Sequence, residues 1–229
     1  QEDVANTMNK YDLIVLPVVN DLNQLIGRIT VDDVMDIMKE EAEKDYQMAS
    51  GIFEDVEPSD AIWEITRARL PWLLIGMIGG LFGAKVIGIF DIEKNYQMAF
   101  FIPLIAAMGG NVGVQSAAIV VQSLAGGTNT LGNVSQRLIK ELGVALVNGT
   151  ICSSIILLAA YLLGYGLLLS MTVSIALLSV IIFAALFGTF IPLTLNKYKI
   201  DPALATGPFI TTINDVLGLF IYFLIGQLI

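Results

Sequence analysis

The sequence predicts an all-α polytopic membrane protein, with five transmembrane helices and a small α/β fragment at the N-terminus. Apolar residues make up 55% of the chain, the mean hydropathy is +0.75, and charged residues make up only 14%. Soluble domains carry roughly 25% charged residues. Charge is also uneven, because residues 1–60 hold 15 of the 21 acidic residues. The chain therefore divides into a short acidic segment and a membrane domain.

The acidic segment begins with two β-branched stretches, 12–19 and 24–31, which predict strands joined by the turn NDLN at 20–23. A helix is expected over 32–48, with one apolar and one acidic face. Two strands and one helix bury too little apolar surface to fold alone. The chain also lacks an initiator Met. We therefore expect an internal fragment of a longer protein.

The membrane domain contains apolar runs that are long enough to cross a bilayer, which needs about 20 residues. These runs cover about 70–90, 97–125, 142–165, 167–195 and 203–228. Polar breaks at 91–96, 126–137 and 196–201 separate most of them, and the GYG of 164–166 separates the third from the fourth. Lys and Arg concentrate on the side of the N-terminus. This bias predicts a cytoplasmic N-terminus and an external C-terminus.

Several classes of function do not fit the residue types. The chain has no His and a single Cys, Cys152, so it lacks the common ligands of zinc and copper and the HExxH motif of metalloproteases. The one acid deep in a span, Asp215, cannot form an aspartyl dyad within one subunit. We therefore expect no enzyme, and no nucleic-acid partner.

Asp215 lies near the middle of the last span. A helical face joins it to small or polar residues at spacings of four, four, three, four and four: Gly207, Thr211, Asp215, Gly218, Tyr222 and Gly226. An ionised Asp costs a few kcal/mol or more in a bilayer, so it usually faces water or a partner. An ion or proton site is the favoured interpretation. A structural ion pair or a protonated, hydrogen-bonded Asp is the alternative.

The second span carries a polar face of its own. Asn111, Gln115, Ala118 and Gln122 share this face, while Gly109 and Gly113 form a small-xxx-small pair for close helix approach. Amides in a membrane can simply join helices. Two polar-faced helices, one of which carries the deep acid, favour a pore between them.

The chemistry of this face suits a hard cation, because it offers carboxylate, hydroxyl, amide and carbonyl oxygens. One Asp is too little for a dehydrated Mg²⁺ or Ca²⁺, whereas a symmetric dimer would present two copies of Asp215 to a hydrated Mg²⁺. From the residue types alone, Na⁺ and H⁺ stay open.

Three stretches resemble a known family. PVVNDLNQLIGRITVDDVMDIM resembles the second half of a CBS domain, and GGNVGVQS and DPALATGPFITTINDVLG resemble the two pore motifs of the MgtE magnesium channels. The resemblance implies part of a CBS domain at 1–38, an acidic connecting helix and linker at 32–60, and a five-helix pore domain at 61–229. It also implies a homodimer in the cell membrane that conducts hydrated Mg²⁺ into the cytoplasm through a pore at the dimer axis. Nucleotide binding is not expected, because the CBS domain is incomplete.

The resemblance also implies roles for individual residues. Pore metal contacts fall on Asp215, Thr211 and Gly110. Candidates for lining the pore are Asn111, Gln115, Gly207, Thr212, Asn214 and Gly218. Regulatory Mg²⁺, which favours closure, is expected at acids of the connecting helix and the cytoplasmic face: Asp33, Asp36, Glu41, Asp45, Glu141 and Asp201. The alternative function is a proton- or Na⁺-coupled divalent-cation transporter that uses Asp215 as its coupling site.

Overall fold

The computed structural model describes residues 2–90, 92–125, 134–205 and 207–229. The chain falls into two compact units, Gln1–Gln47 and Met48–Ile229.

The first unit contains helix α1 (Glu2–Lys10), the antiparallel hairpin of β1 (Val15–Val19) and β2 (Leu25–Thr30), and most of α2 (Val31–Ala49). The predicted strands and the acidic helix are confirmed. The turn is closed by the Asn20 side chain, whose Oδ1 accepts from the backbone N–H of Leu22 at 3.0 Å and of Gln24 at 2.9 Å. Helix α1 was not predicted, because it has no apolar run. Its Ala5 and Met8 nevertheless pack with Val34 of α2 in a small core.

The second unit is helical and includes five helices that are long and apolar enough to cross a membrane. Its elements, in order, are α3 (Ile62–Ile89), η1 (Ile92–Phe101), α4 (Ile102–Ala125), α5 (Val134–Leu162), α6 (Leu167–Lys197), η2 (Pro202–Ala205) and α7 (Pro208–Leu228). The predicted polytopic all-α architecture is confirmed.

The helix N-termini differ from the predicted spans in several places, among them α7, which begins at Pro208 and not at about 203. Helices α3 and α5 begin about eight residues before the apolar runs at 70 and 142. Their N-terminal parts carry charged residues, including Arg67 on α3 and Arg137 on α5, which hydropathy alone assigns to a loop. Helical hydrogen bonding continues beyond the apolar part of each sequence, so hydropathy detects only part of each helix.

The breaks at 164–166 and 196–201 can be compared with the structure. The second is confirmed, because α6 ends at Lys197 and η2 begins at Pro202. Gly164 and Gly166 have φ values of 87° and 79°, a backbone conformation that strongly favours glycine, and the GYG turn separates α5 from α6 as predicted. The break expected at 126–137 falls largely on 126–133, which lie outside the described residues.

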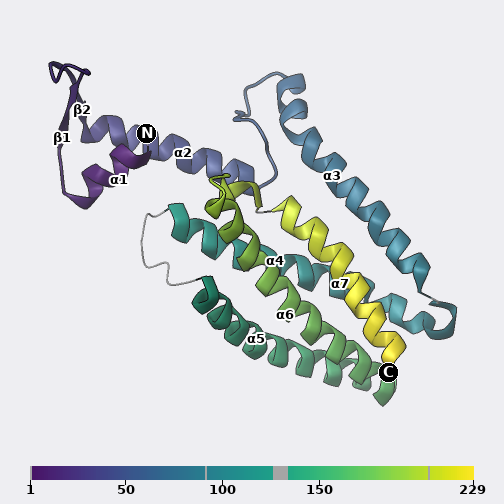
Figure 1. The fold of residues 1–229 in the computed structure, drawn as a ribbon. Coiled ribbons are helices and arrows are strands. Elements are labelled where there is room, and N and C mark those ends of the chain that lie inside the picture. Colours follow the sequence, from purple (N-terminus) through teal and green to yellow (C-terminus); the bar gives the residue numbers. More distant parts are fainter. Residues whose placement is uncertain (1, 91, 126–133, 206) are drawn as a thin grey trace. The chain divides into compact units, whose positions relative to one another are not determined.

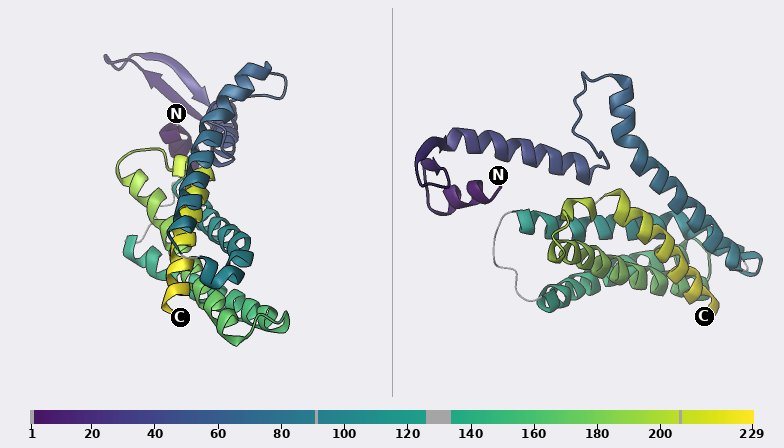
Figure 2. Two further views of the ribbon diagram at one scale, coloured as in Figure 1. Left: turned by 90° about the vertical axis from the view of Figure 1, so that its right-hand side faces the viewer. Right: turned by 45° about the horizontal axis from the view of Figure 1, so that its top comes forward.

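Helix α6 is central to the second unit: it packs against α4, α5 and α7, while α3 packs on α7 (Figures 1 and 2). The interior is formed by aromatic and aliphatic side chains, among them Phe101, Ile105, Leu177, Val180 and Tyr222. At the end of α3, Phe90 stacks on Phe223 of α7 with ring centroids 5.5 Å apart. This packing fixes α4 and α7 against one side of α6.

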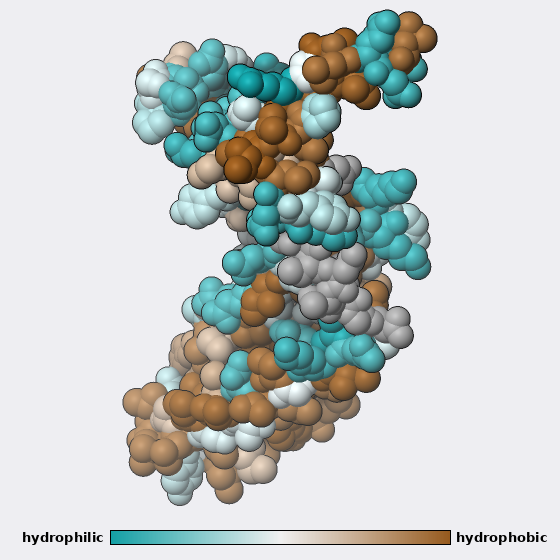
Figure 3. Space-filling view, turned by 90° about the vertical axis from the view of Figure 1, so that its left-hand side faces the viewer, coloured by the Kyte–Doolittle hydropathy of each residue, from teal (hydrophilic) through white to brown (hydrophobic). Residues whose placement is uncertain are grey.

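The polar side chains of α6 are mostly satisfied within the helix. The hydroxyls of Ser170, Thr172, Ser179 and Thr194 each donate to the carbonyl four residues earlier, at 2.7–2.9 Å. Outside the core, hydrophobic side chains predominate on the lower part of the surface in Figure 3. An apolar exterior of this kind suits contact with lipid.

Candidate functional site

Helix α7 positions the acid of the last span. Gly207 is its N-cap residue and Pro208 occupies the first turn, where the missing N–H of proline is tolerated. Gly207 has φ 49°, and a Cβ added there would collide with the backbone oxygen of Ala49. The carbonyl of Gly207 accepts from the Thr211 hydroxyl at 2.9 Å. A glycine is thus required where the chain turns into α7, two helical turns before Asp215.

Asp215 is half-buried on α7. Among the described residues, none donates a hydrogen bond to its carboxylate and no base pairs with it. A carboxylate inside an apolar bundle needs water, a cation or a proton. The absence of a protein partner within the described chain agrees with an ion or proton site and disfavours a structural ion pair inside the protomer.

Gly110 of α4 lies next to this acid. A Cβ at Gly110 would be 3.1 Å from Thr211 Cγ2 and 3.6 Å from Asp215 Oδ1. The lack of a side chain lets the backbone of α4 approach α7 closely at this point. The structure therefore brings together Gly110, Thr211 and Asp215, the three residues expected to contact metal.

The polar face of α4 remains accessible beside them. Asn111 and Gln115 are both exposed in the protomer and lie one helical turn apart. A second copy of the chain, water or an ion could contact this face without displacing the core.

The remaining pore-lining candidates on α7 point elsewhere. Thr212 packs against α3, because a Cβ at Gly79 would meet the Thr212 side chain. Gly218 is buried 3.3 Å from Val180 Cγ1, measured from its ideal Cβ. Asn214 is only 1% exposed and lies against Gly109 and Gly113 of α4. In the protomer α3 and α6 cover two sides of α7, and spacing along one helix cannot distinguish these sides from a pore.

The amide of Asn214 has no hydrogen-bond partner on either its nitrogen or its oxygen among the described residues. An unsatisfied buried amide is costly. The α4–α7 contact beside Asp215 therefore contains a buried polar side chain, Asn214, that makes no hydrogen bond within the described residues.

The acids of α2 are spread along the helix. Asp33 caps its first turn: Oδ2 accepts from the Thr30 hydroxyl at 2.6 Å and from the Thr30 N–H at 2.8 Å. The hydroxyl hydrogen bond is the main cause that lowers the pKa of Asp33, followed by the backbone hydrogen bond. Glu41 lies 3.8 Å from the Lys44 ammonium, Asp36 is exposed, and Asp45 is partly exposed. Within the described residues of this one chain, no three Asp, Glu, His or Cys side chains gather as a metal site.

The two other regulatory candidates make local hydrogen bonds. Asp201 accepts from the backbone N–H of Ala203 at 2.8 Å and so caps η2. Glu141 of α5 accepts from the Ser116 hydroxyl of α4 at 2.6 Å. Neither carboxylate is part of the group formed by Gly110, Thr211 and Asp215.

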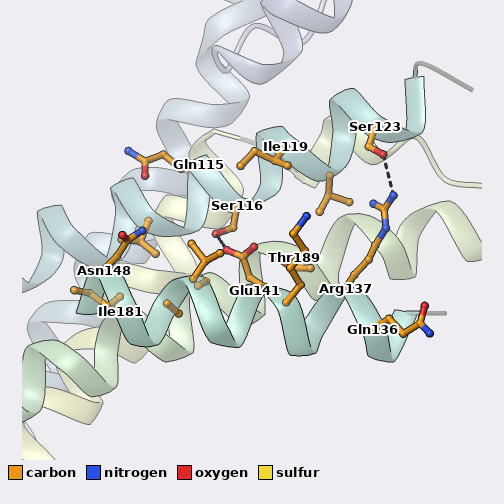
Figure 4. A pocket seen from close by; sticks show the side chains of 16 residues that line it. Gln115, Ser116, Ile119, Ser123, Gln136, Arg137, Glu141, Asn148, Ile181 and Thr189 are labelled. Atoms are coloured by element: carbon orange, nitrogen blue, oxygen red, sulfur yellow. Dashed lines mark hydrogen bonds between the residues drawn. The ribbon is translucent and has the colours of Figure 1, made fainter. Parts of the chain in front are cut away.

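A second polar feature lies between α4, α5 and α6, where a pocket of about 670 Å³ is lined by apolar and polar side chains (Figure 4). Besides the Ser116–Glu141 hydrogen bond, Arg137 Nη2 donates to Ser123 Oγ at 2.9 Å. Arg137, Glu141 and Asn148 follow one face of α5 at spacings of four and seven, a signal that was present in the sequence. Sequence reasoning missed the pocket because its lining comes from three helices.

Comparison with known proteins gives the family. The family profile described as "MgtE: Divalent cation transporter" matches residues 102–225, which include α4, α7 and the group at Gly110, Thr211 and Asp215. The chain belongs to the MgtE family of divalent cation transporters. This is a family of transporters and not of enzymes.

Curated relatives extend the similarity over nearly the whole chain. The chain is 34% identical to a protein named magnesium transporter MgtE of Bacillus subtilis over 97% of its length, 34% identical to the protein of that name of Thermus thermophilus over 100%, and 35% identical to that of Enterococcus faecalis over 100%. These matches cover 50%, 52% and 51% of the relatives. The chain thus spans about half the length of the curated relatives it matches.

Proposed function

We propose that this chain forms the pore-bearing part of a Mg²⁺ channel that conducts hydrated Mg²⁺ into the cytoplasm. The observation that carries the proposal is the meeting of Gly110, Thr211 and the unpaired Asp215 between α4 and α7. The names of the relatives, magnesium transporters, support Mg²⁺ as the transported ion. Mg²⁺ loses water reluctantly and is usually held through retained waters and one or two carboxylates.

The pore is proposed to lie on the axis of a homodimer. One chain supplies a single carboxylate at this site, and the exposed amides Asn111 and Gln115 leave the adjoining face of α4 free for a second copy. Two Asp215 carboxylates would then share one hydrated divalent ion. The bias of Lys and Arg supports a multi-pass arrangement in the cell membrane with a cytoplasmic N-terminus and an external C-terminus.

Mg²⁺ uptake by a Mg²⁺-dependent strain tests the pore site. Removing the charge in Asp215→Asn and the side chain in Asp215→Ala should each lower uptake at least about tenfold, equivalent to about 1.4 kcal/mol of lost ion stabilisation. Glu64→Gln is the matched control, because it neutralises an acid at the first turn of α3. Wild-type uptake by both Asp215 variants would rule out the site.

Closure by cytoplasmic Mg²⁺ is the second part of the proposal. Asp33, Asp36, Glu41 and Asp45 give α2 an acidic side, and acidic helices that approach each other in a dimer repel until divalent ions bridge them. A double variant, Asp36→Asn with Glu41→Gln, should need more Mg²⁺ to reduce the current. An unchanged Mg²⁺ dependence would limit the proposal to conduction.

The alternative is a proton- or Na⁺-coupled transporter in which Asp215 is the coupling site. The same half-buried carboxylate supports it, since a carboxylate without a protein partner can also bind a proton. Reconstituted vesicles separate the two functions. A channel gives a Mg²⁺ current that reverses with voltage, whereas a coupled transporter gives a flux that depends on a pH or Na⁺ gradient.

A further inference from the structure

The pocket between α4, α5 and α6 (Figure 4) is separate from the group at Asp215, because α7 contributes nothing to its lining. It opens at the end of the bundle where α4 finishes at Ala125 and α5 starts at Val134. Arg137 lies in the first turn of α5 and Ser123 in the last turn of α4. Arg side chains at the end of a membrane-spanning helix usually lie at the headgroup level of the bilayer, and we infer that depth for this end of the pocket.

The basic residues of the pocket are not neutralised by the described part of the protein. Arg137 bonds to the Ser123 hydroxyl and Glu141 to the Ser116 hydroxyl, and these two charged side chains, one turn apart on α5, form no ion pair with each other. Lys140 also lines the pocket and has no carboxylate partner among the described residues. Arg137, Lys140 and Glu141 together give the lining one net positive charge, which favours an anion at the end that carries the two bases.

A buried donor lies deeper in the same pocket. Thr189 of α6 lines it, is 2% exposed, and its hydroxyl has no hydrogen-bond partner in the described chain. Gln115 and Asn148 add amide groups, and Figure 4 shows them at the end away from Arg137. Donors beyond the bases fit the ester carbonyls of a glycerol backbone.

The length and lining of the pocket distinguish a lipid from a small anion. Arg137 and Asn148 are eleven residues apart on one helix, which corresponds to about 16 Å. Val144 lies between them on α5, Ile181 lies at the Asn148 end, and Ile119 is 66% exposed. Inorganic phosphate fills only the basic end. A diacyl lipid fills both the polar end and the apolar wall.

We propose that this pocket binds an anionic glycerophospholipid, with its phosphate at Arg137 and Lys140, its esters near Thr189, and the start of an acyl chain along Val144 and Ile181. The site requires only that the helices are embedded in a membrane and does not depend on the transport function. The probe is phosphatidylglycerol, with phosphatidylcholine as the zwitterionic competitor.

Native mass spectrometry of the full chain, released from vesicles that contain equal amounts of the two lipids, tests the proposal. Wild type should retain phosphatidylglycerol about tenfold or more over phosphatidylcholine, and Arg137→Gln with Lys140→Gln should lose most of that preference. Lys197→Gln with Lys199→Gln is the matched control, because it removes two bases outside this pocket. An unchanged preference in the pocket variant, or an equal loss in the control, would overturn the proposal.

Two further variants separate lipid binding from folding. Thr189→Val keeps the shape of the side chain and removes the unpartnered hydroxyl, so it should weaken lipid retention severalfold while leaving the thermal midpoint unchanged or higher. Val144→Trp should be quenched by phosphatidylglycerol that carries bromine near the start of its acyl chain. Displacement of the lipid by inorganic phosphate alone, or no quenching in a folded variant, would contradict the proposed occupant.

Discussion

At the scale of single residues, the α4–α7 contact contains two polar side chains that make no hydrogen bond with the described part of the protomer. Asp215 and Asn214 are neighbours in sequence, yet they point to different surroundings: the acid lies beside Gly110, and the amide is buried against Gly113. Neither has a protein hydrogen-bond partner in the described chain. The acid can be satisfied by a cation, whereas the amide is enclosed.

Asn214→Leu tests whether the amide stabilises the structure described here. The substitution replaces an unsatisfied polar group by an apolar one of similar size, so the free energy of unfolding should fall by no more than about 1 kcal/mol, or rise. The thermal midpoint in detergent measures it. A loss of several kcal/mol would mean that the amide makes a hydrogen bond in the folded protein. Leu219→Ala, which empties a buried position of the same helix, is the destabilising reference.

Gly110→Ala tests the contact beside Asp215. The added methyl would come within 3.1 Å of Thr211 Cγ2, so α4 and α7 must separate by a few tenths of an ångström. We expect folding to be retained and Mg²⁺ uptake to fall severalfold, because the carboxylate moves relative to the α4 backbone. Gly80→Ala is the control, since nothing lies within 4 Å of its added Cβ. Equal uptake by both variants would contradict a role for this close approach.

At the scale of secondary-structure elements, close backbone contact between α4 and α6 supports the whole second unit. A Cβ at Gly188 of α6 would run into the backbone of Gly113 on α4, and backbone cannot rotate away as a side chain can. Gly149 of α5 faces side chains of α6 instead, with its ideal Cβ 2.7 Å from Leu178 Cδ1 and 3.4 Å from Ile181 Cγ2. Small residues thus set the distances between α6 and its neighbours.

Gly188→Ala should therefore destabilise the protein by about 1–3 kcal/mol, the usual cost of overpacking. Gly143→Ala on α5 should change stability by no more than about 1 kcal/mol and in the opposite direction, because its added methyl meets nothing within 4 Å and alanine favours a helix. Thermal midpoints of the two variants in the same detergent give the comparison. Similar midpoints would show that α4 and α6 separate easily.

The junction between β2 and α2 depends on a single carboxylate. Hydrogen bonds from Thr30 lower the pKa of Asp33. The stabilisation that the ionised Asp33 gives to the folded state is therefore fully present above the usual carboxylate pKa, and it is lost as the pH falls through the lowered pKa. Asp33→Ala should increase amide hydrogen exchange at Thr30 near neutral pH, measured on the full chain. Asp32→Ala, in the same turn, is the control. Equal protection in both variants would contradict the capping role.

At the scale of the whole molecule, composition and hydropathy predicted an all-α membrane protein, the number of its spans and their approximate positions along the chain. They missed α1, whose Ala5 and Met8 face the core without any apolar run. They also began α3 and α5 too late, because charged residues such as Arg137 continue those helices. Hydropathy identifies the part of a helix that suits an apolar environment, whereas the helix itself extends as far as its backbone hydrogen bonds are formed.

The candidate site was predicted in part. Asp215 is identifiable from its cost in a membrane, and the family motifs add Gly110 and Thr211, which the structure places beside it. The burial of Asn214 and Gly218 could not be predicted, because one helix's spacing does not tell which neighbour covers which side. The pocket at Arg137 and Thr189 needs the packing of three helices, which no single stretch of sequence encodes.

Cross-linking tests the proposed assembly. In a Cys152→Ser background, Asp215→Cys should be joined into a dimer in membranes by a short bifunctional thiol reagent, because the two thiols would face each other across the space for a hydrated ion, which is too wide for a direct disulfide. Ile151→Cys, exposed on α5, should remain monomeric on denaturing gels. Dimers from Ile151→Cys and none from Asp215→Cys would place the axis elsewhere.

The hydroxyls of α6 have a mechanical consequence. Ser170, Thr172, Ser179 and Thr194 donate to carbonyls of their own helix, so these hydrogen bonds travel with α6 when it slides or turns as a rigid rod. Its contacts with α4 and α7 through Gly188 and Val180 depend on shape instead. Small displacements of this rod against α4 and α7 therefore meet steric resistance, and these four hydroxyls add no hydrogen-bond barrier. Against α5 one hydrogen bond does resist sliding, because the Ser174 hydroxyl donates to the Ser153 carbonyl at 2.7 Å.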